Sequence, residues 1–293
     1  MAVAPAPPWR EYLLYLPRGF DARRKPALVV WIHGCRQQPE EFAAGTRIAR
    51  FADERGFVVL LPRQTRLANS ERCWNWFDRR TIGGGGEAAI VAAQAAEAIG
   101  KFGIDPRRVC VAGLSSGGTL AATLALRAPQ IFAAVAIHSA VPCGSASDAA
   151  DAVRVMSQGP RESVDALALE ARARAQGKAR VPALVIQGAA DTTVAPVNSV
   201  FLARQFLLFN GFAQDHLPAG AALPPAQVGA FQPRASGYLT SDYQAGRRLA
   251  ARLVTIPGLG HAWSGGDAAY PFFDGRHLDA TELVCDFFAA HWQ

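Results

Sequence analysis

The chain has 293 residues, half of them apolar, with 30 basic and 24 acidic side chains and a net charge of +6. This length and composition exclude a wholly disordered chain and allow one large α/β domain or two small ones. The basic residues are scattered in short pairs. Nucleic-acid binding would require a concentrated basic stripe with interleaved aromatic residues, so we expect no nucleic-acid partner.

Membrane, export and metal signals are missing from the sequence. No segment reaches the roughly 20 apolar residues of a membrane span, and residues 1–8 show no basic region followed by an apolar core. We therefore expect no membrane partner and a cytoplasmic chain as it stands, or a secreted one if a signal was removed. The five cysteines show no C-x-x-C spacing and the chain has no H-E-x-x-H motif, so we expect no metal site.

Apolar runs and helical spacing alternate along the chain. The runs predict strands, several of them continuous Val, Ile, Leu and Ala stretches that are typical of strands covered on both faces. They lie at 12–16, 27–33, 57–61, 109–112, 133–137, 183–186 and 249–256, and helices are predicted at 87–99, 116–127, 197–209 and 281–291. This alternation predicts an α/β fold with a doubly wound, mostly parallel sheet in a single domain over residues 1–293.

Two segments interrupt the alternation. Residues 142–180 separate two core strands by more than a usual connection, and we interpret them as a small cap insertion. Within this segment, Pro160 and Gly177 bracket a predicted helix. Residues 210–236 are rich in Pro, Gly and Ala without periodicity, and we interpret them as a loop excursion. A lid and a tolerated surface insertion both remain open for that loop.

A pentapeptide after the run 109–112 carries the strongest chemical signal. It reads Gly113-Leu114-Ser115-Ser116-Gly117, a G-x-S-x-G motif between a predicted strand and a predicted helix. Small residues on both sides allow the strained turn that exposes a serine hydroxyl at the carboxyl edge of a sheet. Ser115 is therefore the candidate nucleophile.

A serine nucleophile needs a base and a carboxylate that orients the base. Asp191 follows the run 183–186, and His261 follows the run that ends at Ile256. The order serine, acid, histidine and the position of each residue after a strand are those of α/β-hydrolases. We therefore assign Asp191 and His261 as the other two members of a catalytic triad.

The oxyanion that forms during acyl transfer also needs hydrogen-bond donors. His33-Gly34-Cys35 follows the second predicted strand, where a lipase-type oxyanion loop would lie. The backbone N–H groups of Cys35 and Ser116 are the predicted donors.

These features together resemble the polyhydroxybutyrate (PHB) depolymerase family of esterases, which are α/β-hydrolases related to feruloyl and acetyl-xylan esterases. The resemblance implies Ser115 as nucleophile, His261 as base and Asp191 as orienting acid, and it leaves the substrate open. The residues that carry it are His33-Gly34-Cys35, Cys73-Trp74-Asn75-Trp76-Phe77, the glycine run before Glu87, Gly113-Leu114-Ser115-Ser116-Gly117-Gly118, Asp191 and Gly260-His261-Ala262-Trp263-Ser264-Gly265-Gly266.

Three aromatic residues are candidates for substrate binding. Trp263, two residues after the proposed base, is predicted to line the pocket, and one of Trp74 and Trp76 is predicted to do so as well. Cys35 and Cys73 both border the site in this arrangement. A disulfide between them and two free thiols are the open alternatives.

The predicted function is hydrolysis of carboxylic esters through an acyl-enzyme, with no cofactor. The expected partner is a small-molecule or oligomeric ester, of the 3-hydroxybutyrate type or another short-chain ester, because no appended substrate-binding domain follows the triad in the sequence. A feruloyl or acetyl-xylan type of esterase is the alternative. Acyl transfer to a sugar or lipid hydroxyl is an alternative of another class.

Overall fold

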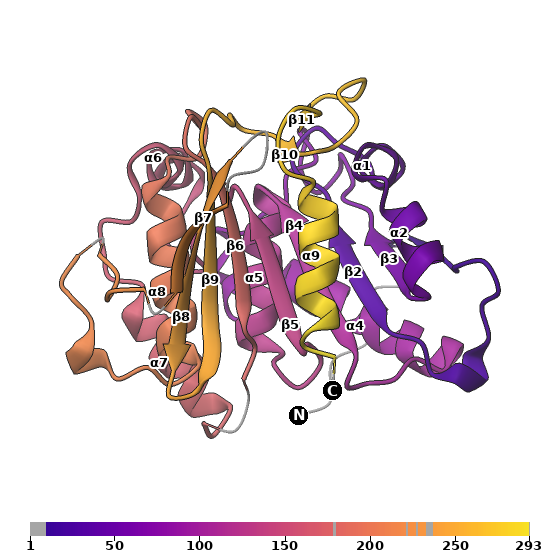
Figure 1. Cartoon of the computed structure of the whole chain (residues 1–293), viewed down its shortest axis with the longest axis horizontal. Helices are drawn as coiled ribbons and strands as arrows, with labels where there is room; N and C mark the ends of the chain where they lie inside the picture. Colours follow the sequence, from indigo (N-terminus) through magenta and orange to yellow (C-terminus); the bar gives the residue numbers. More distant parts are fainter. Residues whose placement is uncertain (1–9, 178–179, 221, 227, 233–236, 293) are drawn as a thin grey trace.

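A computed structural model describes residues 10–177, 180–220, 222–226, 228–232 and 237–292, with only the backbone described for 228–232. These residues contain a nine-stranded sheet with the order β1-β3-β2-β4-β5-β6-β9-β8-β7 (Figure 1). The strands from β3 to β9 in this order run parallel, and β1, β8 and β7 pair antiparallel at the two edges. The predicted doubly wound, mostly parallel sheet is confirmed.

The strand positions agree with the apolar runs of the sequence within a few residues. Their bounds are β1 Tyr12–Tyr15, β2 Leu28–Ile32, β3 Val58–Pro62, β4 Val109–Leu114, β5 Ala134–His138, β6 Ala183–Gly188, β7 Val228–Gln232, β8 Tyr238–Ala245 and β9 Arg248–Ile256. Two further short strands, β10 Trp263–Ser264 and β11 Phe273–Asp274, pair with each other. They lie with α6 at the upper edge of the sheet in Figure 1.

Helices cover both faces of the sheet. Their bounds are α1 Pro39–Thr46, α2 Ile48–Arg55, α3 Arg79–Ile82, α4 Gly86–Phe102, α5 Ser116–Arg127, α6 Ala149–Gln158, α7 Asp165–Arg174, α8 Val197–Phe209 and α9 Ala280–Ala289. Helices α4, α5 and α8 pack on one face and α1, α2 and α9 on the other, so α9 crosses in front of the sheet in Figure 1. None of the helices within the described ranges is long and apolar enough to span a membrane.

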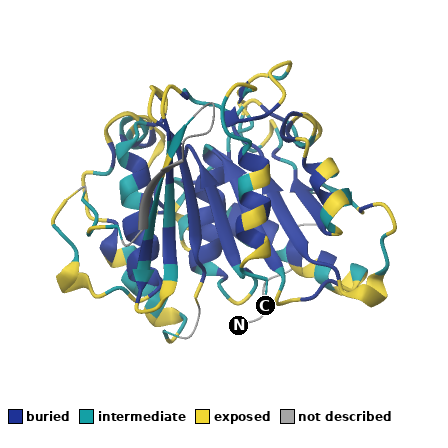
Figure 2. Cartoon of the chain, in the orientation of Figure 1, coloured by how far each residue is buried: buried dark blue, intermediate teal, exposed yellow. Residues whose placement is uncertain are grey.

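The central strands are buried on both faces, which explains their continuous apolar sequences. Along β2, Leu28 and Val30 belong to the core under α4 and α5, whereas Val29 and Trp31 belong to the core under α2 and α9. Successive side chains of a strand point to opposite faces, so a doubly covered strand must be apolar at every position. Figure 2 shows the resulting dark blue layer of buried strands between partly exposed helices.

The prediction of a plain loop at 210–236 is wrong in part. The segment contains a 3-10 turn at Gln214–His216 and strand β7, which pairs antiparallel with β8 at the sheet edge. Strand β8 was also missed, and it forms a hairpin with β9 around Gly246, whose φ of 65° suits a tight turn. Cross-strand pairing of edge strands is not visible in local periodicity. Residues 221, 227 and 233–236 of this segment lie outside the described residues.

The segment 142–180 contains two helices rather than the one predicted. Helix α6 precedes Pro160, and α7 begins at Asp165 rather than near Pro160. The Asp165 carboxylate accepts hydrogen bonds from Nε and Nη2 of the Arg204 guanidinium of α8, at 2.7 and 2.6 Å, and both side chains are about nine-tenths buried. This bidentate ion pair attaches α7 to the main domain. Residues 178–179 lie outside the described residues, and the assignment of 142–180 as a cap stays a prediction.

We expect Asp165→Ala to destabilise the protein by about 3 kcal/mol, because it leaves the buried Arg204 guanidinium without its counterion. Urea unfolding measures the change. Arg174→Ala is the matched control on the same helix. Arg174 is exposed and pairs only at the surface, so its loss should cost less than about 0.5 kcal/mol. Equal effects of the two variants would contradict the ion-pair argument.

Candidate active site

Ser115 lies in the tight turn between β4 and α5. Its φ of 54° and ψ of −120° are strained for a residue with a side chain. A Cβ on Gly113 would lie 2.3 Å from the Gly117 carbonyl oxygen, and a Cβ on Gly117 would lie 2.4 Å from the His33 carbonyl oxygen. The glycines of the pentapeptide are therefore required by close backbone approach. The Ser115 N–H donates to the His138 carbonyl at 2.9 Å, which holds the turn against β5.

The three predicted triad residues lie in one hydrogen-bonded chain. The Ser115 Oγ is 3.0 Å from His261 Nε2, and His261 Nδ1 is 2.8 Å from Asp191 Oδ2. Ser115 and His261 are partly accessible, and the Asp191 side chain is fully buried. The carboxylate accepts a hydrogen bond from the Nδ1–H, so the lone pair of Nε2 is free to accept the proton of the serine hydroxyl.

Asp191 is held as a carboxylate by several donors. Burial raises its pKa, but the hydrogen bond from His261 and those from the backbone N–H groups of Val194 and Thr193 outweigh burial and leave the pKa below its usual range. The Gln187 amide also contacts Oδ2 at 3.3 Å. The acid is therefore ionised at neutral pH and fixed in orientation.

The loops that carry the acid and the base are packed directly on each other. The N–H of Ala190 donates to the Leu259 carbonyl at 3.0 Å, and a Cβ on Gly188 would lie 2.3 Å from the same oxygen. Because β6 and β9 are neighbours in the sheet, the loops that follow them meet at one edge. This places Asp191 and His261 together although 69 residues separate them in the sequence.

The predicted oxyanion loop lies against the nucleophile. A Cβ on Gly34 would be 3.5 Å from the Ser115 Cβ. The His33 Nδ1 is 2.7 Å from the Gly34 carbonyl, and its Nε2 accepts the Gln64 N–H, so Nδ1 carries the proton and donates. Since C=O and N–H point in opposite directions in a trans peptide, this bond turns the Cys35 N–H away from His33. Within the described residues, the N–H groups of Cys35 and Ser116 donate to no protein acceptor.

Cys35 and Cys73 form a disulfide, which joins the oxyanion loop to the segment before α3. The Ser116 hydroxyl lies 3.4 Å from Cys35 Sγ and accepts the Trp74 N–H at 3.3 Å. The Trp74 indole N–H donates to the His33 carbonyl at 2.9 Å. The disulfide and Trp74 thus connect the two segments that supply the predicted oxyanion donors.

The prediction that Trp263 lines a pocket is wrong. Its side chain is 1 % exposed and packs against Trp31, Phe42 and His138, with its indole N–H on Thr281. Trp263 is close to His261 in the sequence, but β10 turns its side chain into the core.

The other two tryptophans are also buried, so they do not line an open surface. Trp74 is 2 % exposed and supports the oxyanion loop. Trp76 is 5 % exposed and packs with Phe77, Val141 and Val194 beneath the segment that carries α6. A contact between Trp76 and substrate stays a prediction.

Sequence reasoning missed several residues that support the site. They are Gln37, whose carbonyl oxygen accepts the Gly34 N–H, the buried His138, and Glu87, which holds the segment at Asn75. None belongs to a motif with known chemistry, although Glu87 follows a run of glycines. Among the residues that the structure describes, no group of three His, Cys, Asp or Glu side chains could hold a metal ion.

The sheet order, the turn at Ser115 and the placement of acid and base after two neighbouring strands define an α/β-hydrolase fold. A solved acetyl xylan esterase from Aspergillus awamori has this fold, with a TM-score of 0.77 over 98% of this chain and 97% of that one at 21% identity. The family model for esterase PHB depolymerase matches residues 10–222. The chain therefore belongs to this family.

Curated relatives include different esterases. The chain is 32% identical over 203 residues to poly(3-hydroxyalkanoate) depolymerase C of Paucimonas lemoignei, covering 68% of this chain and 48% of that protein. It is 34% identical over 130 residues to feruloyl esterase B of Neurospora crassa, covering 44% of each. The chain thus spans about half the length of the curated relatives it matches.

Two buried histidines at the site should make stability depend on pH. Burial lowers the pKa of His33 to about 4 and that of His138 to about 3. The unfolded chain protonates both near pH 6.5, so it binds more protons than the folded chain below that pH. The two histidines therefore contribute fully to the free energy of unfolding above pH 6.5. This contribution declines as the pH falls towards 4, at up to about 1.4 kcal/mol per pH unit for each histidine.

Urea unfolding between pH 7 and 5 tests this expectation. His33→Asn, which keeps a donor for the Gly34 carbonyl, should reduce the pH slope by roughly half. His216→Asn is the control at an exposed histidine and should leave the slope unchanged. An unchanged slope in His33→Asn would contradict the burial argument.

Proposed function

We propose that this chain hydrolyses carboxylic esters through an acyl-enzyme on Ser115. The observation that supports this best is the continuous chain from Asp191 through His261 to Ser115, at 2.8 and 3.0 Å. The N–H groups of Cys35 and Ser116 beside it donate to no protein acceptor within the described residues. A nucleophile, a base and two open donors are the parts that acyl transfer requires.

In the first step, His261 Nε2 takes the hydroxyl proton while Ser115 Oγ bonds to the ester carbonyl carbon. The carbonyl oxygen becomes an oxyanion that accepts hydrogen bonds from the Cys35 and Ser116 N–H groups. His261 then gives its proton to the leaving alkoxide, and the alcohol departs. In the second step, water attacks the acyl-enzyme by the same route and releases the acid, which restores Ser115.

We propose a 3-hydroxybutyrate-type oligomer or another short-chain ester as substrate. The family membership and the likeness to a poly(3-hydroxyalkanoate) depolymerase over two thirds of this chain support that choice. The likeness to a feruloyl esterase covers less of this chain and supports the alternative of an aromatic or acetyl ester. The buried positions of Trp74 and Trp263 remove two of the aromatic residues that would have bound an aromatic acyl group.

We expect Ser115→Ala to lower kcat by at least about 10⁴-fold on every ester that the wild type hydrolyses, because no other group replaces the nucleophile. Steady-state kinetics on p-nitrophenyl butyrate, 3-hydroxybutyrate trimer and methyl ferulate measure this loss. Ser157→Ala is the matched control, since that hydroxyl is exposed and bonds only to its own helix. Equal rates for wild type and Ser115→Ala would refute the proposed nucleophile.

The same panel tests the substrate class. The proposal expects a higher kcat/KM on the hydroxybutyrate trimer than on methyl ferulate, because remote contacts along an oligomer contribute transition-state binding. A higher value on methyl ferulate would instead support the aromatic alternative.

A further inference from the structure

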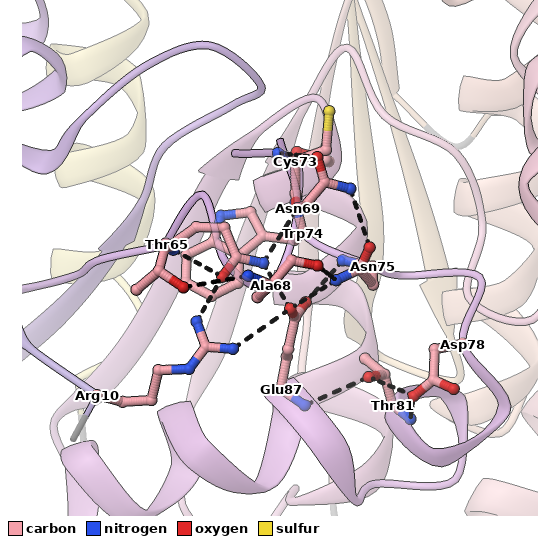
Figure 3. Close-up of polar contacts among 12 residues, drawn as sticks. Arg10, Thr65, Ala68, Asn69, Cys73, Trp74, Asn75, Asp78, Thr81 and Glu87 are labelled. Atoms are coloured by element: carbon pink, nitrogen blue, oxygen red, sulfur yellow. Dashed lines mark hydrogen bonds and ion pairs between the residues drawn. The ribbon is translucent and has the colours of Figure 1, made fainter. Parts of the chain in front are cut away.

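Glu87 is a buried carboxylate that the hydrolytic steps do not use. It lies in the first turn of α4 and is 6 % exposed. Figure 3 shows its side chain rising from the helix into the segment 64–75, with Arg10 approaching from the opposite side to Thr81. A buried carboxylate is costly unless donors surround it, so the groups that it contacts must be held in place.

The donors come mainly from one short segment, residues 73–75, which we call the support segment. The Asn75 N–H donates to Glu87 Oε2 at 2.6 Å, and the Asn75 side-chain amide donates to Oε1 at 2.9 Å. The Gln64 amide donates to Oε1 and also to the Cys73 carbonyl, at 3.0 Å for the latter. The Arg10 guanidinium is 3.9 Å from Oε1. Glu87 thus holds the support segment directly at Asn75 and, through the Gln64 amide, at Cys73.

The support segment in turn touches both predicted oxyanion donors. Cys73 is covalently bound to Cys35. The Trp74 N–H donates to the Ser116 hydroxyl, and the Trp74 indole N–H donates to the carbonyl of His33, the residue that orients the Cys35 peptide. The loop before α1 and the start of α5 come from distant parts of the sequence. Within the described residues, these contacts place one segment against both of them.

We propose that Glu87 is a positioning residue for the oxyanion hole. It acts through the support segment to set the distance between the Cys35 and Ser116 N–H groups. This inference rests on the proposed function, because an oxyanion forms only if the chain performs acyl transfer. Donors held in place before reaction stabilise the transition state without reorganisation, and small displacements lose much of that effect.

Glu87→Gln in the full chain is the first test. The variant keeps the side-chain volume, but its amide replaces one acceptor by a donor that faces the Gln64 and Asn75 amides. We expect kcat on p-nitrophenyl butyrate to fall by about 10- to 100-fold with KM within about 2-fold, because the lost contact acts only in the transition state. Glu97→Gln is the control on the same helix, where Glu97 pairs at the surface with Lys101, and it should keep the wild-type kcat.

A second measurement separates positioning from simple stabilisation. Rates are measured well below the thermal midpoint of each variant, so that all of the protein is folded. The double variant Glu87→Gln/Ser116→Ala should lose less kcat than the product of the two single losses, because both act on the same contact chain. An unchanged kcat in Glu87→Gln, or losses that multiply in the double variant, would overturn the inference.

A third measurement does not depend on catalysis. We expect dithiothreitol to reduce the Cys35–Cys73 bond at least about 5-fold faster in Glu87→Gln than in the wild type, because a released support segment opens more often to solvent. Alkylation and mass mapping follow the rate, with Asn75→Ala as a second variant if Glu87→Gln does not fold. An unchanged reduction rate would overturn the positioning role. A wild type that hydrolyses no ester while the rate still rises would refute the proposed function and reduce the role of Glu87 to holding the support segment.

Discussion

The site depends on the strained backbone of one residue. Ser115 has φ 54° because it is the one residue between the end of β4 and the start of α5, and that turn exists only where Gly113 and Gly117 let three backbone segments approach closely. The same approach brings the His33 carbonyl beside α5 and therefore brings the oxyanion loop beside the nucleophile. Strain at a single residue is tolerable because a fully buried parallel sheet surrounds it.

The polar groups around this turn are arranged in two separate networks. One runs from the N–H groups of Thr193 and Val194 through Asp191 to His261, and it orients the imidazole. The other runs from Glu87 to the support segment and controls the donors. Both contain a buried carboxylate. A buried ion must keep its hydrogen-bond partners, so it constrains the backbone that carries them. A buried charge therefore fixes geometry even where its net contribution to stability is small.

The histidines illustrate how burial separates similar residues into different roles. His33 and His138 are fully enclosed and neutral, and each accepts a backbone N–H through Nε2. His261 is partly accessible and contacts a carboxylate on one side and a hydroxyl on the other. Of these three histidines, only His261 joins a carboxylate to a hydroxyl. The first two serve as rigid hydrogen-bonding groups.

Some features of the site and the sheet could be predicted from the sequence, and others could not. Ser115, Asp191 and His261 could be predicted to lie together because each follows a predicted strand, and strand ends of a parallel sheet meet at one edge. Trp263 could not be placed in this way, since β10 and its pairing with β11 turn the side chain inward. Strands β7 and β8 were missed because edge strands carry mixed sequences and form only against a neighbour.

The parallel sheet, its doubly covered strands and the order serine, aspartate, histidine after strands could be predicted from local features of the sequence. These features are continuous apolar runs, the 3.6-residue period of helices and a short glycine-rich turn. Other features follow only from the tertiary structure: the burial of Trp74, Trp76 and Trp263, the meeting of Cys35 with Cys73, and the groups that surround the buried Glu87 carboxylate. Those outcomes depend on contacts between segments that are far apart in the chain, and no local pattern encodes the direction in which such a side chain finally points.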